Sequence, residues 1–182
     1  MSIRVPIASR GWNSYICSRI YGEGMSSPAS VKGDLVPYSD EYSQTVRSWI
    51  DSEETHQNVC RGSGFPPPGE IIDSWQREGV QSYLLVAGNK PVAYAELWNR
   101  STDMAVEIAH LIVDPRYRSE GFGTRMLELL YERASQKKNT AKVIISLYGE
   151  STEALGCYLK AGFELIGTTT YTTGLKLVRP VD

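Results

Sequence analysis

The stretch RYRSEGFGTR, residues 116–125, carries two glycines one residue apart and follows an apolar run that ends at Asp114. Such a turn leaves backbone N–H groups unpaired at the start of a helix, where the aligned peptide dipoles favour negative charge. A side chain at Gly121 or Gly123 would hold a phosphate away from these groups. The stretch therefore predicts a pyrophosphate site, although a plain strand-to-helix connector uses glycine in the same way.

Two familiar phosphate motifs do not fit the stretch. A dinucleotide fingerprint has a third glycine where this chain has Met126, and a Walker loop has Gly-Lys-Ser or Gly-Lys-Thr. We find no adenine or ribose recognition motif either, which disfavours a nucleotide-binding module.

Hydrophobic spacing predicts the elements that position the turn. Helices are expected at 40–51, after Pro68, from about Gly121, and at 152–161 with Gly162 as the C-cap. Strands are expected at 81–88 and 91–99 as a hairpin, at 104–113, at 141–148, and in a terminal hairpin over 164–180. Strands that first meander and then alternate with helices predict a mixed α/β sheet covered by helices.

Composition narrows the class of protein. The 182 residues predict an N-terminal arm (1–33) and a single domain (34–182), and the net charge of -2 gives no reason to expect nucleic acid or membrane as partner. Three widely spaced cysteines and two histidines predict neither a disulfide framework nor a metal site. Without a leader or a long apolar run, a cytoplasmic protein is expected. The arm is a candidate homodimer contact by position alone.

Two motifs resemble those of the GNAT superfamily of acyl-CoA-dependent N-acyltransferases. The run EIAHLIVDPRYRSEGFGTRML is similar to the family's central motif, with Arg118, Gly121 and Gly123 at its fixed positions. The run STEALGCYLKAGFELIG resembles the second signature, with Tyr158 in place and Ser151 where the family usually has Asn. The resemblance implies a mixed, mostly antiparallel central sheet with a splayed parallel strand pair, flanked by helices.

The resemblance also implies acetyl-CoA as cosubstrate and no metal. Its pantetheine arm would pair with the backbone of the strand before the turn, where an amide near Leu111 would hold the thioester oxygen. The implied cofactor-binding residues are Leu111, Ile112, Val113, Arg118, Ser119, Glu120, Gly121, Phe122, Gly123, Thr124 and Ser151.

Direct transfer to an amine needs a base, because most amines are protonated at pH 7. Glu107 has the spacing of the catalytic glutamate in the histone acetyltransferase branch, and Tyr158 has the family's acid position; each could instead be an ordinary strand or packing residue. If Asn99 pairs with Met104, then Glu96 lies opposite Glu107 and could bind a cationic substrate.

The sequence thus predicts an N-acetyltransferase that moves the acetyl group of acetyl-CoA directly to a primary amine, in a small molecule or a peptide. The alternative is a non-catalytic acyl-CoA-binding or regulatory domain that kept the turn and lost the chemistry. The identity of the amine stays open.

Overall fold

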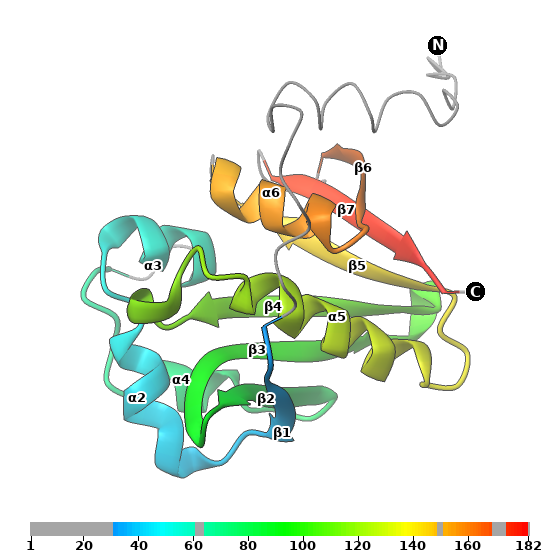
Figure 1. The fold of residues 1–182 in the computed structure, drawn as a ribbon. Helices are drawn as coiled ribbons and strands as arrows, with labels where there is room; N and C mark the ends of the chain where they lie inside the picture. Colours follow the sequence, from blue (N-terminus) through cyan, green and yellow to red (C-terminus); the bar gives the residue numbers. More distant parts are fainter. Residues whose placement is uncertain (1–30, 61–63, 149–150, 169–173, 182) are drawn as a thin grey trace. The chain divides into compact units, whose positions relative to one another are not determined.

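The computed structural model describes residues 31–60, 64–148, 151–168 and 174–181 (Figure 1). The predicted N-terminal arm lies outside them up to Ser30, as does the turn of the terminal hairpin, residues 169–173. All the elements below belong to the compact unit that begins at Val31. None of the helices in this described part is long and apolar enough to cross a membrane.

A mixed sheet forms the centre of this unit, as predicted (Figure 1). Within the described residues its order is β1-β2-β3-β4-β5-β7-β6, and only the β4–β5 pair is parallel. The strands are β1 (Asp34–Pro37), β2 (Val80–Ala87), β3 (Lys90–Arg100), β4 (Ala105–Val113), β5 (Lys142–Leu147), β6 (Glu164–Thr168) and β7 (Leu175–Pro180).

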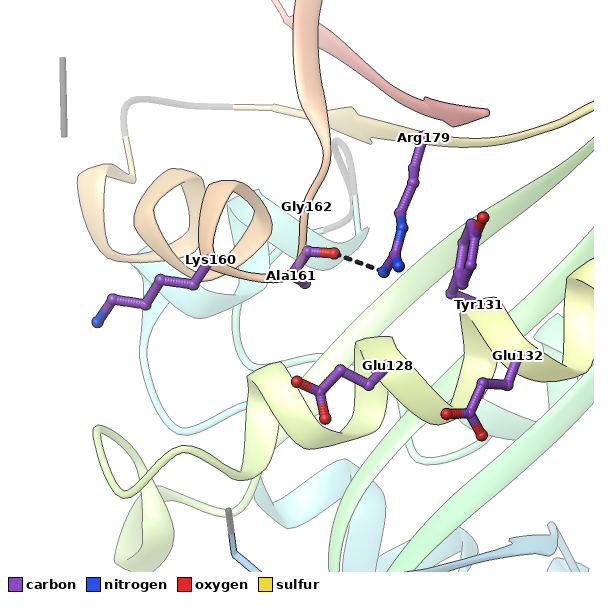
Figure 2. A pocket seen from close by; sticks show the side chains of 7 residues that line it. All are labelled: Glu128, Tyr131, Glu132, Lys160, Ala161, Gly162 and Arg179. Carbon is purple, nitrogen blue, oxygen red and sulfur yellow. Dashed lines mark hydrogen bonds between the residues drawn. The ribbon is translucent and has the colours of Figure 1, made fainter. Parts of the chain in front are cut away.

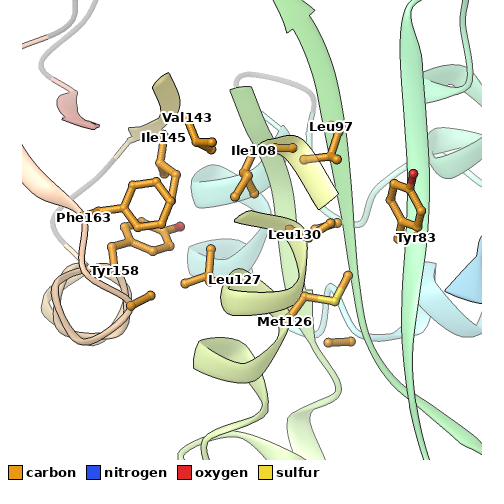
Figure 3. Close-up of a cluster of buried hydrophobic side chains, with 14 of the residues drawn as sticks. Tyr83, Leu97, Ile108, Met126, Leu127, Leu130, Val143, Ile145, Tyr158 and Phe163 are labelled. Atoms are coloured by element: carbon orange, nitrogen blue, oxygen red, sulfur yellow. The ribbon is translucent and has the colours of Figure 1, made fainter. Parts of the chain in front are cut away.

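Helices cover both faces of the sheet. They are η1 (Asp40–Tyr42), α2 (Ser43–Ser48), α3 (Glu53–Cys60), α4 (Ile71–Trp75), η2 (Ser101–Asp103), η3 (Pro115–Tyr117), α5 (Phe122–Ser135) and α6 (Thr152–Lys160). Helices α5 and α6 bury Met126, Leu127, Leu130 and Tyr158 against one face (Figure 3). On the other face, α2 and α4 bury Val46 and Ile72 against Tyr94 and Ile112. We call this second side the acceptor face.

Capping residues fix where the helices near the turn begin and end. Asp114 stops β4 and accepts hydrogen bonds from the backbone and guanidinium of Arg116. Gly121 has φ +94 as the N-cap of α5, and Gly162 has φ +82 just after α6. Both values lie in a region that glycine adopts readily, which explains why the sequence has glycine at these two helix ends.

The parallel pair separates halfway along β4. Its pairing with β5 runs only from Ala105 to Ile108, against Lys142 to Ile145. Just beyond, β4 contains a bulge: Glu96 pairs with Ala109 but Tyr94 pairs with Ile112, and His110 takes φ +50. The splayed strand pair expected from the family resemblance is therefore present.

The predicted register of the β3–β4 hairpin is wrong by two residues. Arg100 pairs with Ala105, so Trp98, not Glu96, lies opposite Glu107. The reason is Met104, whose φ of +47 belongs to the turn rather than to the strand. Because a shift of two residues preserves the face, Glu96 and Glu107 still lie on the same side of the sheet.

Helix α3 was not predicted from the sequence. Its stretch EETHQNVC buries only His56 and presents no apolar stripe. Periodicity alone therefore could not reveal it.

Candidate active site

The glycine turn lies at the N-terminus of α5, beside the point where β4 leaves β5. Ser119 and Gly121 both have positive φ, +62 and +94, while Glu120 is exposed. Positive φ at every second residue turns successive backbone N–H groups toward one side, which is the geometry of an anion-binding nest. The predicted cofactor residues from Arg118 to Thr124 are contiguous in this turn and in the first turn of α5.

The two glycines of the turn meet different physical requirements. Gly121 needs its backbone angle, since a Cβ there would meet nothing closer than Val31, at 3.8 Å. Gly123 has ordinary helical geometry, but a Cβ there would lie 3.2 Å from Cys157 Sγ and 3.5 Å from Val113 Cγ2. The missing side chain at Gly123 therefore allows the start of α5 to approach α6 and β4 closely.

The side chain of Arg118 fastens the turn to the acceptor-face helices. Its guanidinium donates to Trp49 O and Asp51 Oδ1, both at 2.9 Å, and to Val113 O at 3.3 Å. Burial raises the pKa of Asp51, but the hydrogen bond and charge of Arg118 outweigh it and hold the pKa below its usual value. Arg118 is thus already engaged within the protein, which leaves the backbone of the turn to face a ligand.

Other predicted cofactor residues are also engaged within the protein. Ser119 Oγ donates to Glu153 at 2.9 Å, and Ser151 Oγ accepts from Ala154 N as the N-cap of α6. Thr124 Oγ1 lies 3.4 Å from Cys157 Sγ. These contacts join the N-termini of α5 and α6, so both helix starts are held near the turn.

The strand edge beyond Ile108 is the second part of the candidate site. Ile112 and Val113 pair with β3, but neither is paired with β5. Ile112 is buried on the acceptor face, whereas Leu111 and Val113 pack toward α5. This backbone edge could accept an extended ligand as an added strand.

Both oxygens of the predicted base, Glu107, are occupied. Arg100 donates to Oε2 through Nε at 2.8 Å and lies 2.6 Å away through Nη2, and Ser146 Oγ donates to Oε1 at 2.9 Å. The carboxylate is nearly buried on the acceptor face. It is therefore held in an ion pair rather than presented as a free base.

Glu96 is fully enclosed at the centre of a polar cluster. The Tyr94 hydroxyl donates to Oε1 at 2.7 Å, and Trp98 Nε1 donates to Oε2. Burial, followed by the charge of Glu96, raises the pKa of the Tyr94 hydroxyl. With 0% exposure, Glu96 has no surface on which to receive a substrate directly.

Sequence reasoning did not single out His110, which completes this cluster. Its Nδ1 lies 3.0 Å from Glu96 Oε2, at ion-pair distance but without the alignment of a hydrogen bond. The ring stacks on Trp75, with centroids 3.9 Å apart, and meets the edge of Trp98 at 5.3 Å. The sequence carries no signal for this role, because the bulge and the end of the β5 pairing are features of the structure.

Tyr158, the predicted acid, lies on the other face of the sheet. It belongs to the cluster formed with Ile108, Leu127, Ile145 and Phe163 (Figure 3). Burial raises the pKa of its hydroxyl. The hydroxyl therefore stays protonated at neutral pH, as a proton donor must.

A separate cavity of about 380 Å³ lies between α5, the end of α6 and β7 (Figure 2). It is lined by Glu128, Tyr131, Glu132, Lys160, Ala161, Gly162 and Arg179. Arg179 stacks on Tyr131 at 3.6 Å and donates to Ala161 O at 2.8 Å. The cavity includes none of the predicted site residues, and in the described part of the chain no three His, Cys, Asp or Glu side chains form a metal-binding group.

Comparison with known families agrees with this geometry. The model of the acetyltransferase (GNAT) domain matches residues 69–179, more than half of the chain. The chain belongs to this family.

Sequence identity to individual relatives is low. Aminoglycoside N(6')-acetyltransferase type 1 of Klebsiella pneumoniae and that of Serratia marcescens are each 28% identical over 109 residues, 54% of this chain and 54% of theirs. The chain therefore spans about half the length of the relatives it matches in sequence.

Solved structures share the fold at low identity. An aminoglycoside acetyltransferase in complex with coenzyme A and kanamycin has a TM-score of 0.68 at 20% identity, covering 82% of this chain and 95% of that one. The spermidine N-acetyltransferase of Vibrio cholerae, in complex with CoA and spermine, has a TM-score of 0.67 at 11% identity, with 82% and 95% covered. The Escherichia coli ribosomal-protein-S18-alanine N-acetyltransferase has a TM-score of 0.61 at 17% sequence identity, covering 83% of this chain and 95% of that one.

Proposed function

We propose that this chain is an N-acetyltransferase that transfers the acetyl group of acetyl-CoA directly to a primary amine. The observation that carries the proposal is the coincidence of two features: the glycine turn at the start of α5 and the separation of β4 from β5 beside it. The first suits a pyrophosphate and the second suits the extended arm attached to it.

In this proposal the N–H groups from Gly121 to Thr124 receive the pyrophosphate. The pantetheine arm pairs with the free edge of β4, from Leu111 to Val113, with the Leu111 amide at the thioester oxygen. That amide would also stabilise the negative charge that develops on this oxygen during attack. Arg118, Ser119 and Ser151 contribute by holding the turn and both helix starts in place.

The acceptor amine would enter from the acceptor face, where α2 and α4 pack. It must lose a proton before it attacks, and two groups there could take it: Glu107, which the sequence indicates, and His110. The departing thiolate would then take a proton from Tyr158, whose hydroxyl burial keeps protonated.

The substrate screen follows from the relatives. Kanamycin, spermine and a peptide that begins with alanine represent the acceptor classes named for the similar structures. Each would be incubated with acetyl-CoA and the chain, with CoA thiol release and the N-acetylated product measured together. We expect turnover with at least one primary amine and none with the fully N-acetylated form of the same compound.

Acetyl-CoA binding without thiol release from any amine would favour the alternative, a non-catalytic acyl-CoA-binding domain. Binding of ATP or NAD in competition with CoA would instead favour a nucleotide-binding module. A cytoplasmic location and a homodimer stay predictions.

A further inference from the structure

We infer that His110, held by Glu96, is the group that takes the proton from the acceptor amine. The inference rests on the proposed acetyl transfer and goes beyond it by assigning the base. It also gives Glu96 a role that its complete burial allows, as a positioning residue acting through His110.

The position of His110 follows from the bulge in β4. The residue lies two positions beyond Ile108, the last residue paired with β5, and immediately before Leu111, whose amide would hold the thioester oxygen. Its φ of +50 is unusual for a residue with a side chain. Bulges and such backbone outliers recur beside active sites because they redirect a side chain that regular pairing would place elsewhere.

The imidazole is held with one nitrogen inward. Nδ1 is buried and faces Glu96 Oε2 at 3.0 Å. The side chain is 15% exposed, and none of this exposure comes from Nδ1, so it belongs to the rest of the side chain. The stack on Trp75 and the edge contact with Trp98 restrict rotation of the ring.

Glu96 is suited to stabilise the charge that a base acquires. Its carboxylate is excluded from water and receives hydrogen bonds from Tyr94 and Trp98. A buried carboxylate is most stable beside a positive partner, and His110 becomes that partner on accepting a proton. The missing alignment at Nδ1 fits this sequence of events, since catalytic hydrogen bonds often tighten only when substrate binds.

Glu107 is less suited to the same step. Arg100 and Ser146 already donate to both of its oxygens, so an incoming ammonium group would compete with an existing ion pair. We therefore assign Glu107 to holding Arg100 over the Trp98 ring, where the guanidinium lies 5.1 Å from the centroid. Trp98 in turn borders His110.

The proton and electron balance of the step is complete without any further reactant. The ammonium group gives one proton to Nε2 of His110, and the freed lone pair forms the nitrogen–carbon bond to the acetyl group. The carbon–sulfur bond breaks, the departing thiolate takes the proton of the Tyr158 hydroxyl, and the second amine proton restores that hydroxyl. His110 then returns its proton to water, so each turnover releases one proton.

The kinetic test uses His110→Asn. Asparagine tolerates the left-handed backbone and keeps a donor near Nδ1, but it lacks Nε2. We expect kcat/KM for the amine found in the screen to fall by about 10² to 10⁴ at pH 7, with the affinity for acetyl-CoA unchanged. The wild-type profile should reach a plateau below the pKa of the amine, whereas the rate of His110→Asn should keep rising with the neutral fraction of the free amine and reach no such plateau.

Two further variants separate the roles of the carboxylates. Glu107→Gln should lose less activity than His110→Asn and should keep the wild-type plateau. Glu96→Gln should lose activity in the wild-type background but have no further effect in His110→Asn, because Glu96 acts only through the histidine. Additive losses would overturn its positioning role. A plateau lost in Glu107→Gln and kept in His110→Asn would overturn the assignment of His110.

A tautomer measurement tests the same inference without any acceptor. The chain has two histidines, so ¹⁵N-histidine NMR is simple, and His110→Asn identifies the His110 signals by their loss. Glu96 lies beside the ring and accepts from the Tyr94 hydroxyl, while Arg77 and Arg100 lie over the ring of Trp98, which borders His110. We expect neutral His110 to carry its proton on Nδ1, which leaves Nε2 free to act as a base.

The opposite tautomer, with the proton on Nε2, would overturn the inference even if the enzyme is active. Failure of the proposed function looks different, because the wild type would then release no thiol with any amine, whatever the tautomer and whether or not it binds acetyl-CoA. Thiol release by the wild type therefore distinguishes the two failures, and calorimetric titration of acetyl-CoA into the wild type and His110→Asn checks that cofactor binding is unchanged.

Discussion

Replacement of Gly123 by alanine separates two reasons for a glycine at this position. The sequence pattern suggests that a side chain would keep a phosphate at a distance. The structure indicates that it would first meet Cys157 Sγ at 3.2 Å and Val113 Cγ2 at 3.5 Å. The approach to Val113 in β4 is an ordinary contact, but the approach to Cys157 is too close, so the added methyl group would push α5 and α6 slightly apart.

The expected change in the free energy of unfolding follows from two opposing effects. An added methyl group in a filled space costs about 1 to 3 kcal/mol, while alanine is about 1 kcal/mol better than glycine inside a helix. We expect Gly123→Ala to lower the free energy of unfolding by about 1 kcal/mol. Cys157→Ala removes the sulfur atom, so in that background Gly123→Ala should be neutral or stabilising.

Urea unfolding followed by tryptophan fluorescence measures the four members of this cycle, and calorimetry measures their affinity for acetyl-CoA. If packing is the reason for Gly123, Cys157→Ala restores both stability and affinity to the Gly123→Ala chain. An equal loss of stability in both backgrounds would refute the packing explanation. Restored stability with affinity still low would show that the methyl group obstructs the phosphate itself.

Three further predictions follow from the same geometry. Gly121→Val should weaken acetyl-CoA binding and destabilise the chain by about 1 to 2 kcal/mol, because valine disfavours the φ of +94; unchanged calorimetric affinity would exclude the turn as the phosphate site. Tyr158→Phe should fold normally and lose less turnover than His110→Asn, with a loss that grows as the pH rises and water supplies fewer protons; equal turnover at all pH values would leave Tyr158 as a packing residue. Asp51→Asn should lower the free energy of unfolding by about 0.5 kcal/mol at pH 7. The effect is small because Asp51 and Arg118 are both about a third exposed and solvent screens their ion pair. The lowered pKa of Asp51 means that this stabilisation is present above the unfolded carboxyl pKa and disappears as the pH falls through the folded pKa, so the urea midpoints of the two chains should converge as the pH is lowered through that range.

The sequence predicts the elements around the turn well because each has a strong local signal. Apolar residues at helical spacing define α5, and Gly162 ends α6 with φ +82. Helix α3 lacks such a signal, since its only buried residue is the polar His56. Its position depends on packing against β4 rather than on its own pattern.

The candidate base shows a different limit of prediction from sequence. Spacing identifies Glu107, but the ion pair with Arg100 depends on how β3 and β4 pair, which Met104 shifts by two residues. The role of His110 depends on a bulge that no short pattern encodes. The sequence can thus predict which residues lie on a strand. The hydrogen-bond partners of a carboxylate on that strand depend on the pairing register, which the sequence does not reveal.

Hydrogen exchange with and without acetyl-CoA tests the central claim most directly, because it reports where the cofactor binds. We expect slower exchange of the backbone amides from Leu111 to Val113 and from Ser119 to Thr124 when acetyl-CoA is present. Protection confined to the residues around the cavity of α5, α6 and β7, with no change at the turn or at the free edge of β4, would contradict it (Figure 2).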